Sequence, residues 1–337
     1  MKDLNQLNNH SARIAVLLLV AFLTVGCAAL EEAQRRKQER TRQQQQERYV
    51  TFERPNTEIE TSTADSLTLT SEHYTFTFAE DLLTHPDYDE PEERQSIGKG
   101  ALLFMESLYN YVHDIFGFEP KHQLNVNLRQ THHGMTNLAT TSTRTQTVYR
   151  NGEWLKVVEG IDMDFPVGMF NQRDVRAHEL THAFTNIYLL PTWFAEGIAV
   201  LVQVEYARGK SHRRLDLHDE LKTDLDGRNA VQYWKGHLSA DQLTQFRYSY
   251  SYSIVAELKK RFGEDFYPTV FRLIEEDQLH QRLPGEMTTS FLVYYLSQAA
   301  GQDLVPFFEE LKFQVQHLTK SEIVATIMQA NQEKLGR

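Results

Sequence analysis

The sequence predicts an α+β fold, in which a small mixed β-sheet is followed by a mainly helical half. Segments that alternate apolar and polar residues lie before residue 170, whereas segments with apolar residues at helical spacing dominate from residue 174 onward. Runs of strands followed by runs of helices are typical of this class. Of the 337 residues, 41% are hydrophobic and 24% are charged, which are ordinary values for a folded protein.

The predicted strands come first. Residues 74–78 and 124–128 alternate as half-buried strands do. Residues 146–149 and 154–158 flank Asn151-Gly152, a pair that tolerates positive φ, and therefore predict a β-hairpin. Residues 160–165 are expected to form one more strand.

The predicted helices follow from apolar residues at helical spacing. One helix, 101–116, lies between the first two strands and is expected to stop at Gly117. Pro191 separates the first two helices of the C-terminal half, and Thr192 is expected to cap the second. The helices expected in that half are 174–189, 192–206, 250–262, 266–276, 288–300, 303–316 and 320–334.

The N-terminus predicts export. The apolar run 14–26 has 13 residues, too few to span a bilayer as a helix but typical of a signal peptide. It ends at Cys27, the only cysteine, and residues 23–27 resemble a bacterial lipobox with Thr24 where the pattern prefers Leu. We therefore expect a lipoprotein-type signal peptide (1–26) and lipidation of Cys27. A plain signal peptide or a short signal anchor remains the alternative.

The predicted organisation has three parts after the signal. Residues 27–66, rich in Gln, Glu and Arg and then in Ser and Thr, cannot bury a core face and are expected to be a tether, with a solvated helix as the alternative. Residues 67–190 are expected to form an α+β subdomain and residues 191–337 a helical subdomain. The net charge of −11 and the lack of a dense basic run argue against a nucleic-acid partner.

A metal-site motif lies on the first helix of the C-terminal half. His178 and His182 are four residues apart, so both imidazoles of a helix can reach one divalent ion, with Glu179 beside it as a candidate base. Hydrolytic zinc usually takes a third protein ligand. Glu196 is a lone carboxylate in the otherwise apolar segment 193–202, and a metal would explain it.

These residues resemble the gluzincin metallopeptidases, in particular the peptidase MA-like family. Residues 178–182 read His-Glu-Leu-Thr-His, and Glu196 follows 14 residues later within Trp-Phe-Ala-Glu-Gly-Ile-Ala. The resemblance covers about residues 70–315 and is strongest over 174–202. It implies a zincin-like fold, Zn²⁺ on His178, His182 and Glu196, and Glu179 as the general base.

The sequence departs from thermolysin-like enzymes in two ways. The short gap before Glu196 requires the first helix to end near Ile187 or Tyr188. Val200 stands where those enzymes have an Asp that binds a ligand histidine, so another acceptor is needed. Asp174 and Asn186 are the candidates.

Further candidates are weaker. Related aminopeptidases carry a catalytic tyrosine at the start of a similar helix, which favours Tyr248, then Tyr252, as the oxyanion donor; packing at a helix entrance is the alternative. Residues 160–165 are expected to be an edge strand that pairs with substrate, with Asp162 and Asp164 on one face either selecting basic substrates or deterring aggregation. Four other histidines are expected to be mainly surface groups: His132, His133, His280 and His317. Lining of the cleft is the alternative for His132 and His133.

Together these features predict a zinc-dependent peptidase tethered by a lipid anchor in the bacterial cell envelope. Ala28 after the cysteine favours the outer membrane, facing the periplasm or the cell surface. The expected partner is a peptide or protein substrate. Two other functions stay open: a catalytically weak zincin-like lipoprotein that acts as a binding or assembly factor, and a glycoprotein-directed peptidase.

Overall fold

The computed structural model describes residues 58–61, 68–83, 90–131, 138–150, 152–208, 212–218, 230–235 and 240–335. All of them belong to one compact unit, residues 56–337. The predicted signal peptide, Cys27, most of the tether, His132 and His133 lie outside the described residues. In the described part of the chain, no helix combines the length and apolar character that a membrane span requires.

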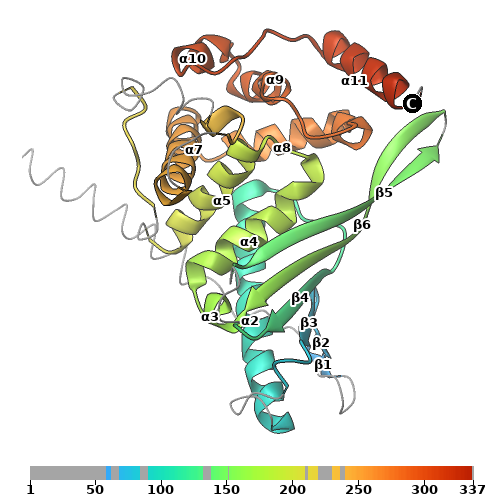
Figure 1. Cartoon of the computed structure of the whole chain (residues 1–337), viewed down its shortest axis with the longest axis vertical. Coiled ribbons are helices and arrows are strands. Elements are labelled where there is room, and N and C mark those ends of the chain that lie inside the picture. Colours follow the sequence, from blue (N-terminus) through green and yellow to red (C-terminus); the bar gives the residue numbers. More distant parts are fainter. Residues whose placement is uncertain are drawn as a thin grey trace, which may run out of the picture. The chain divides into compact units, whose positions relative to one another are not determined.

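A six-stranded mixed sheet forms one side of this unit, in the order β1-β2-β3-β4-β6-β5 (Figure 1). The two pairs that β4 makes, with β3 and with β6, are parallel, and the other pairs are antiparallel. The strands are β1 (Glu60–Thr61), β2 (Thr68–Thr70), β3 (Tyr74–Phe78), β4 (Leu124–Arg129), β5 (Thr140–Arg150) and β6 (Glu153–Pro166). The α+β class and the mixed sheet are thus confirmed.

The hairpin of β5 and β6 is longer than the sequence predicts. The segments expected as a hairpin arm and as a separate strand, 154–158 and 160–165, are one continuous strand, β6. A register shift at Arg144/Thr145, where Val158 and Gly160 are successive partners, interrupts the alternation that sequence reading relies on.

The prediction that 160–165 forms an edge strand is wrong, because β6 pairs with β4 on one side and β5 on the other. Asp162 and Asp164 do share a face, but both are paired. The Asp162 carboxylate accepts hydrogen bonds from Arg144 and Asn125, and Arg129 Nε lies 2.5 Å from Asp164 Oδ2. The edge strand of the sheet on this side is β5, which pairs with β6 and is rich in threonine.

Helices cover one face of the sheet and build the rest of the unit (Figure 1). Four helices match the expected bounds closely: α5 to the residue, and α8, α9 and α11 to within one residue. The helices are α2 (Pro91–Phe116), α3 (Val167–Phe170), α4 (Arg173–Thr185), η1 (Asn186–Tyr188), α5 (Thr192–Tyr206), α7 (Ala240–Phe262), α8 (Phe266–Asp277), η3 (Leu279–Arg282), α9 (Thr289–Ala300), α10 (Val305–Glu310) and α11 (Lys320–Leu335).

Three helix boundaries differ from the prediction by six residues or more. Helix α2 begins at Pro91 and α7 at Ala240, each ten residues earlier than expected. The first turns of α2 are largely exposed and polar, so they lack the apolar stripe that reveals a helix. The helix expected at 303–316 ends at Glu310, because Lys312 adopts positive φ and Phe313 turns back onto Trp193 and Phe308.

The core between sheet and helices holds the metal-site helix α4. Alternate residues of the three central strands are buried against α2 and α4, among them Phe76, Val126 and Met163. On α4 itself, Leu180 and Phe184 are fully buried. Since α4 packs against the sheet, α2 and α5, its side chains are held in fixed directions.

Candidate metal centre

The two motif histidines, His178 and His182, lie one turn apart on α4 and point to the same side.

The chain reverses direction directly after α4. Helix α4 ends at Thr185 and a single 3-10 turn carries the chain to Tyr188, which confirms the expected early end. Leu189 then adopts positive φ, and Pro191 is followed at once by α5. The chain thereby reverses within a few residues and brings α5 back alongside α4.

Helix α5 presents Glu196 to these histidines. Glu196 lies in its second turn and is surrounded in sequence by buried apolar residues. Gly197 allows α5 to approach α7 closely, because a Cβ there would lie 2.8 Å from the carbonyl oxygen of Ser251. Thr192 does not cap the helix as expected: Pro191 is the N-cap residue, and the Thr192 amide donates to Glu286 instead.

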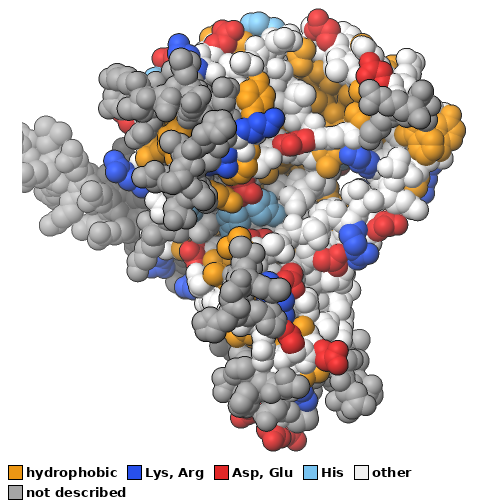
Figure 2. Space-filling view, viewed as in Figure 1, with side chains coloured by type: hydrophobic (Ala, Val, Ile, Leu, Met, Phe, Trp, Pro, Cys, Tyr) orange, Lys and Arg blue, Asp and Glu red, His pale blue; other side chains and the backbone are white. Residues whose placement is uncertain are grey.

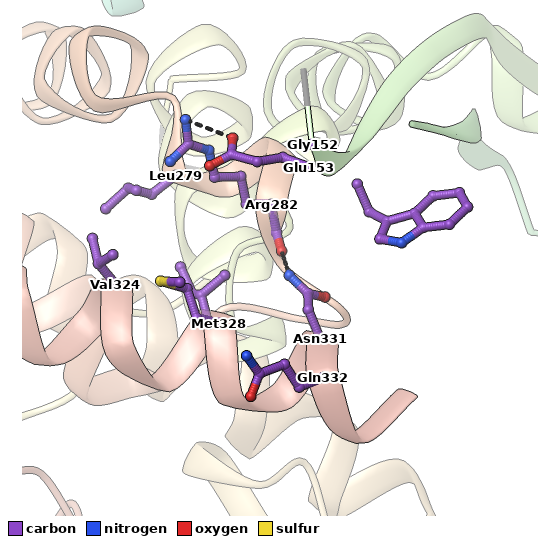
Figure 3. Close-up of a pocket in the computed structure, with 10 residues that line it drawn as sticks. Gly152, Glu153, Leu279, Arg282, Val324, Met328, Asn331 and Gln332 are labelled. Atoms are coloured by element: carbon purple, nitrogen blue, oxygen red, sulfur yellow. Dashed lines mark hydrogen bonds and ion pairs between the residues drawn. The ribbon is translucent and has the colours of Figure 1, made fainter. Parts of the chain in front are cut away.

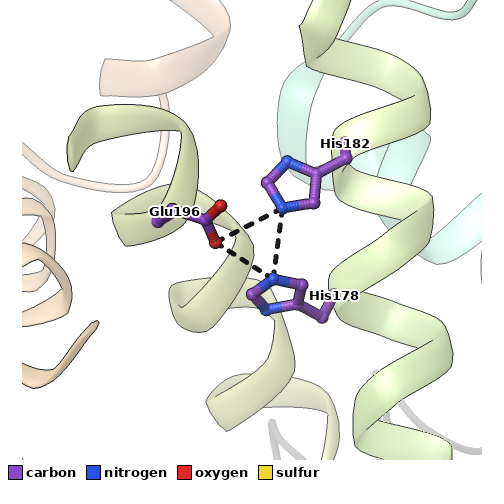
Figure 4. A group of neighbouring side chains, drawn as sticks. All are labelled: His178, His182 and Glu196. Atoms are coloured by element: carbon purple, nitrogen blue, oxygen red, sulfur yellow. Dashed lines mark hydrogen bonds and ion pairs between the residues drawn. The ribbon is translucent and has the colours of Figure 1, made fainter. Parts of the chain in front are cut away.

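His178, His182 and Glu196 converge on one point (Figure 4). The two Nε2 atoms are 3.1 Å apart, and Glu196 Oε2 lies 3.2 Å from that of His178 and 3.4 Å from that of His182. The three side chains are 14%, 12% and 18% exposed, so solvent reaches the group from one side. The sequence prediction that these three meet is therefore matched by the geometry.

These distances fit a tetrahedral zinc ion. With zinc–ligand bonds of about 2.0–2.1 Å, tetrahedral geometry separates neighbouring ligand atoms by roughly 3.3–3.4 Å. Glu196 Oε2 is shielded from solvent and receives no hydrogen bond of normal geometry from the described residues. Lone pairs on these two nitrogens and one oxygen repel one another when they face the same point, so the arrangement is unfavourable without a cation between them.

The charges at the site reinforce this fit. Burial raises the pKa of the Glu196 carboxyl, but the facing imidazoles of His178 and His182 hold that pKa well below its usual range. Burial lowers the pKa of His178, but the Glu196 carboxylate raises it by more, so the net shift of the His178 pKa is upward. The carboxylate is therefore ionised at neutral pH, as a metal ligand must be.

The acceptor for the ligand histidine is Gln203, which the sequence prediction missed. His178 Nδ1 lies 3.0 Å from Gln203 Oε1, and Gln203 Nε2 donates to Asp174 Oδ2 at 3.3 Å. Asp174 thus acts through Gln203 rather than directly. Among the described residues, Asn186 makes no hydrogen bond with His178 or His182, and its side-chain amide donates to the Thr141 carbonyl oxygen. Gln203 stands two turns after Glu196, and a polar residue at that spacing in an apolar helix was the available signal.

Glu179, the residue between the histidines, is 7% exposed and anchored by the edge strand. The Thr141 hydroxyl on β5 lies 2.8 Å from Glu179 Oε2 and 2.9 Å from the Glu179 carbonyl oxygen. One hydroxyl proton can serve only one of these acceptors at a time. The carboxylate is consequently held near β5 while keeping free acceptor capacity.

Tyr248 completes the site from α7. Its ring centroid lies 6.1 Å from that of His178, and the rings of His212 and Trp234 pack on it at 5.9 and 5.5 Å. Burial raises the pKa of the Tyr248 phenol, and the nearby charges of Glu196 and Glu179 raise it further, so the group stays a protonated donor at neutral pH. Tyr248 lies inside α7 rather than before it, as the early start of that helix requires.

The other sequence candidates lie elsewhere. Tyr252, one turn after Tyr248, has Arg214 and Glu205 as its charged neighbours. His280 is 4% exposed and packs against Tyr188, so the expectation of a surface position is wrong. His317 is exposed, with Nδ1 3.6 Å from Asp303. None of these three contributes to the group of His178, His182 and Glu196.

Comparison with known proteins supports the same reading of the site. Residues 176–312 match the family model described as Peptidase M60, enhancin and enhancin-like. No curated protein matches the chain. The matched stretch contains all three candidate ligands, Glu179 and Tyr248. Residues 176–312 therefore carry the pattern of Peptidase M60, a zinc metallopeptidase family of gluzincin type, and the predicted gluzincin resemblance is confirmed.

Proposed function

We propose that this protein is a zinc-dependent peptidase tethered in the bacterial cell envelope. The observation that carries the peptidase assignment is the convergence of His178, His182 and Glu196 at zinc-ligand spacing, with Glu179 on the same helix and Tyr248 beside it. The family match to a metallopeptidase supports it.

The residues of the site have distinct roles in this proposal. A zinc ion held by His178, His182 and Glu196 would supply Lewis-acid polarisation of the scissile carbonyl. Glu179 accepts the proton of the attacking water and delivers it to the departing amine. Thr141 holds that carboxylate in position, and Tyr248 donates a hydrogen bond to the carbonyl oxygen as negative charge develops on it.

The substrate strand is proposed to pair with β5. Among the described strands, β5 has a neighbour on one side only, and its first residues contact Glu179 through Thr141. An extended peptide that adds to this edge would lie beside the catalytic groups. Edge pairing, expected earlier for residues 160–165, thus moves to β5.

Location in the envelope rests on the N-terminal sequence. The short apolar run 14–26, its end at Cys27 and the polar segment 27–66 favour a lipid anchor and a tether. Intact-mass analysis of the purified chain tests this part separately: diacylation at Cys27 is expected, and a mass without lipid would contradict it.

The two alternatives make different predictions. A binding or assembly factor would retain zinc and a specific partner yet hydrolyse neither peptides nor unfolded protein. The absence of an Asp at position 200 favours this alternative, but Gln203 supplies an acceptor for His178. A glycoprotein-directed peptidase would cleave mucin-like protein and spare the same protein after deglycosylation.

The decisive experiment measures bound metal per chain by elemental mass spectrometry on the 67–337 fragment. One zinc per chain is expected, with loss in His178→Ala and Glu196→Ala. His317→Ala is the matched control, because His317 is an exposed histidine outside the site. A folded fragment that binds no zinc after zinc addition would overturn the metal site, and full hydrolysis by Glu179→Gln would remove Glu179 from the mechanism.

A further inference from the structure

A pocket lies between the tip of the β5–β6 hairpin, η3 and α11, away from the metal centre (Figure 3). Its volume is about 210 Å³, and a second cavity of about 150 Å³ adjoins it, sharing Trp154, Arg282 and Asn331 as lining residues. Large apolar side chains are exposed around it: Tyr149 (61%), Met328 (59%) and Trp154 (38%). Figure 2 shows hydrophobic side chains gathered at the hairpin tip, on the same face of the molecule as exposed histidine side chains.

Three of the polar residues that line this pocket, Glu153, Arg282 and Asn331, bind one another. Arg282 forms an ion pair with Glu153 at 3.1 Å, and Asn331 Nδ2 donates to the Arg282 carbonyl at 3.0 Å (Figure 3). The side chains left to receive a ligand are mainly apolar: Trp154, Leu279, Val324, Ile327 and Met328. Gln332 is the other polar side chain of the lining. A pocket with a mainly apolar wall favours an aromatic or aliphatic side chain over a sugar, which needs several free hydrogen-bonding groups.

The hairpin connects this pocket to the metal centre. Thr141, which contacts Glu179, and Tyr149, near the hairpin tip, belong to the same strand, β5. Tyr149 pairs with Trp154, and their rings are 5.0 Å apart. Eight residues of extended chain separate Thr141 from Tyr149, a length of about 27 Å. A peptide paired with β5 at the catalytic groups would therefore reach the pocket.

We infer that this pocket is an exosite for the polypeptide substrate, and this inference rests on the proposed peptidase function. A substrate that lies along the β5 edge, with its scissile bond at Glu179, inserts an apolar or aromatic side chain about eight residues away into the pocket beside Trp154. The preferred substrate class is accordingly a long, extended polypeptide segment rather than a short peptide.

The test compares two probes on the full chain: reduced, carboxymethylated α-lactalbumin and a hexapeptide that brackets the bond cleaved in it. Trp154→Ser and Met328→Asp are expected to lower kcat/KM for the long probe about tenfold, the effect of burying one apolar side chain. Both variants should leave hydrolysis of the hexapeptide unchanged. Ile97→Ser is the matched control, because Ile97 is 41% exposed on α2, and it should change neither rate.

A binding measurement separates failure of the exosite from failure of the proposed function. Fluorescence anisotropy of the labelled long probe is measured on Glu179→Gln with and without Trp154→Ser. Weaker binding in the double variant supports the exosite even if no form of the chain hydrolyses either probe. The exosite would be overturned if the single and double variants bound the long probe equally, or if Trp154→Ser lowered kcat/KM equally for both probes. It would also be overturned if Trp154→Ser weakened binding of a mucin-type oligosaccharide but not of the peptide.

Discussion

Two largely buried groups of histidine and glutamate among the described residues are built differently. In the first, at the N-terminal end of β3, His73 Nδ1 lies 2.6 Å from Glu106 Oε2, and the His73 amide donates to Glu106 Oε1 at 3.0 Å. In the second, between α4 and α5, one oxygen of Glu196 faces two imidazole nitrogens that are themselves 3.1 Å apart.

The difference lies in how many lone pairs must be satisfied. One proton completes the pair of His73 and Glu106, and the ring of Tyr109, stacked at 3.8 Å, seals it. In the group of His178, His182 and Glu196, no single proton serves all three atoms at once. A self-sufficient pair stabilises the fold, whereas an incomplete trio at tetrahedral spacing favours a metal ion.

The largest effect is expected for Glu179 at the metal site, compared with Glu106, the buried partner of His73. Glu179→Gln should lower kcat by about 10²–10⁴-fold, because the amide cannot accept a proton, while bound zinc stays unchanged. Steady-state hydrolysis and metal content are measured together. Glu106→Gln, another buried carboxylate, is the control and should retain the rate per folded chain. A similar loss in both variants would mean that the effect is structural.

Tyr248→Phe should lower kcat by about 10²-fold, since it removes one hydrogen-bond donor to the developing negative charge. The aromatic packing of His212 and Trp234 on the ring is retained, so KM should change little. Tyr252→Phe is the matched control, one turn along α7. If Tyr252→Phe produced the larger loss, the donor would have to be reassigned.

Gln203→Ala should weaken zinc binding roughly 10–100-fold, because His178 loses the group that orients its ring. Competition with a fluorescent chelator measures the affinity. Gln232→Ala is the control and should leave the affinity unchanged, because it removes hydrogen bonds with the main chain of Gln314 and none with the three ligand residues. Unaltered affinity in Gln203→Ala would show that the trio alone fixes the ring.

Gly197→Ala tests whether close packing of α5 on α7 positions Glu196 and Tyr248. A Cβ at 2.8 Å from the Ser251 carbonyl oxygen must displace backbone, which costs about 1–3 kcal/mol of stability. Chemical denaturation with and without zinc gives the number. Gly100→Ala on α2, where a Cβ meets nothing within 4 Å, should be neutral or stabilising.

The smallest effect is the pH dependence of the self-sufficient pair. Burial lowers the pKa of His73, but Glu106 raises it above its ordinary value of 6.5. Burial raises the pKa of Glu106, but hydrogen bonds from the ring and the backbone amide of His73 bring it below 4.5. The stabilisation of the folded state by protonated His73 is therefore complete below pH 6.5 and is lost as the pH rises through the folded-state pKa of His73. The stabilisation of the folded state by ionised Glu106 is complete above pH 4.5 and is lost as the pH falls through the folded-state pKa of Glu106.

The Tm advantage of the wild type over His73→Gln should thus be greatest between about pH 4.5 and 6.5 and shrink toward pH 9, by on the order of 2 °C. Calorimetry across this range measures it. A difference that grew with pH would contradict the assignment of a charged pair.

Local patterns in the sequence determined much of this protein. Helix α5 was predicted to the residue, because Pro191 and a segment that is apolar from 193 to 202 except at Glu196 define it locally. The spacing of His178 and His182, and the isolation of Glu196 in an apolar helix, predicted the metal group because helical periodicity fixes directions within one or two turns. The N-terminal signal, Cys27 and the tether remain predictions.

Only the tertiary structure decided which segments meet. Residues 160–165 look like an edge strand, yet β6 lies inside the sheet, because strand order depends on pairing between distant segments. Gln203 rather than Asp174 or Asn186 contacts His178, since the crossing of α4 and α5 selects the partner. Thr141 reaches Glu179, and Trp154 reaches α11, across long stretches of sequence. Periodicity acts over a few residues, whereas packing brings distant residues together and decides what each side chain contacts.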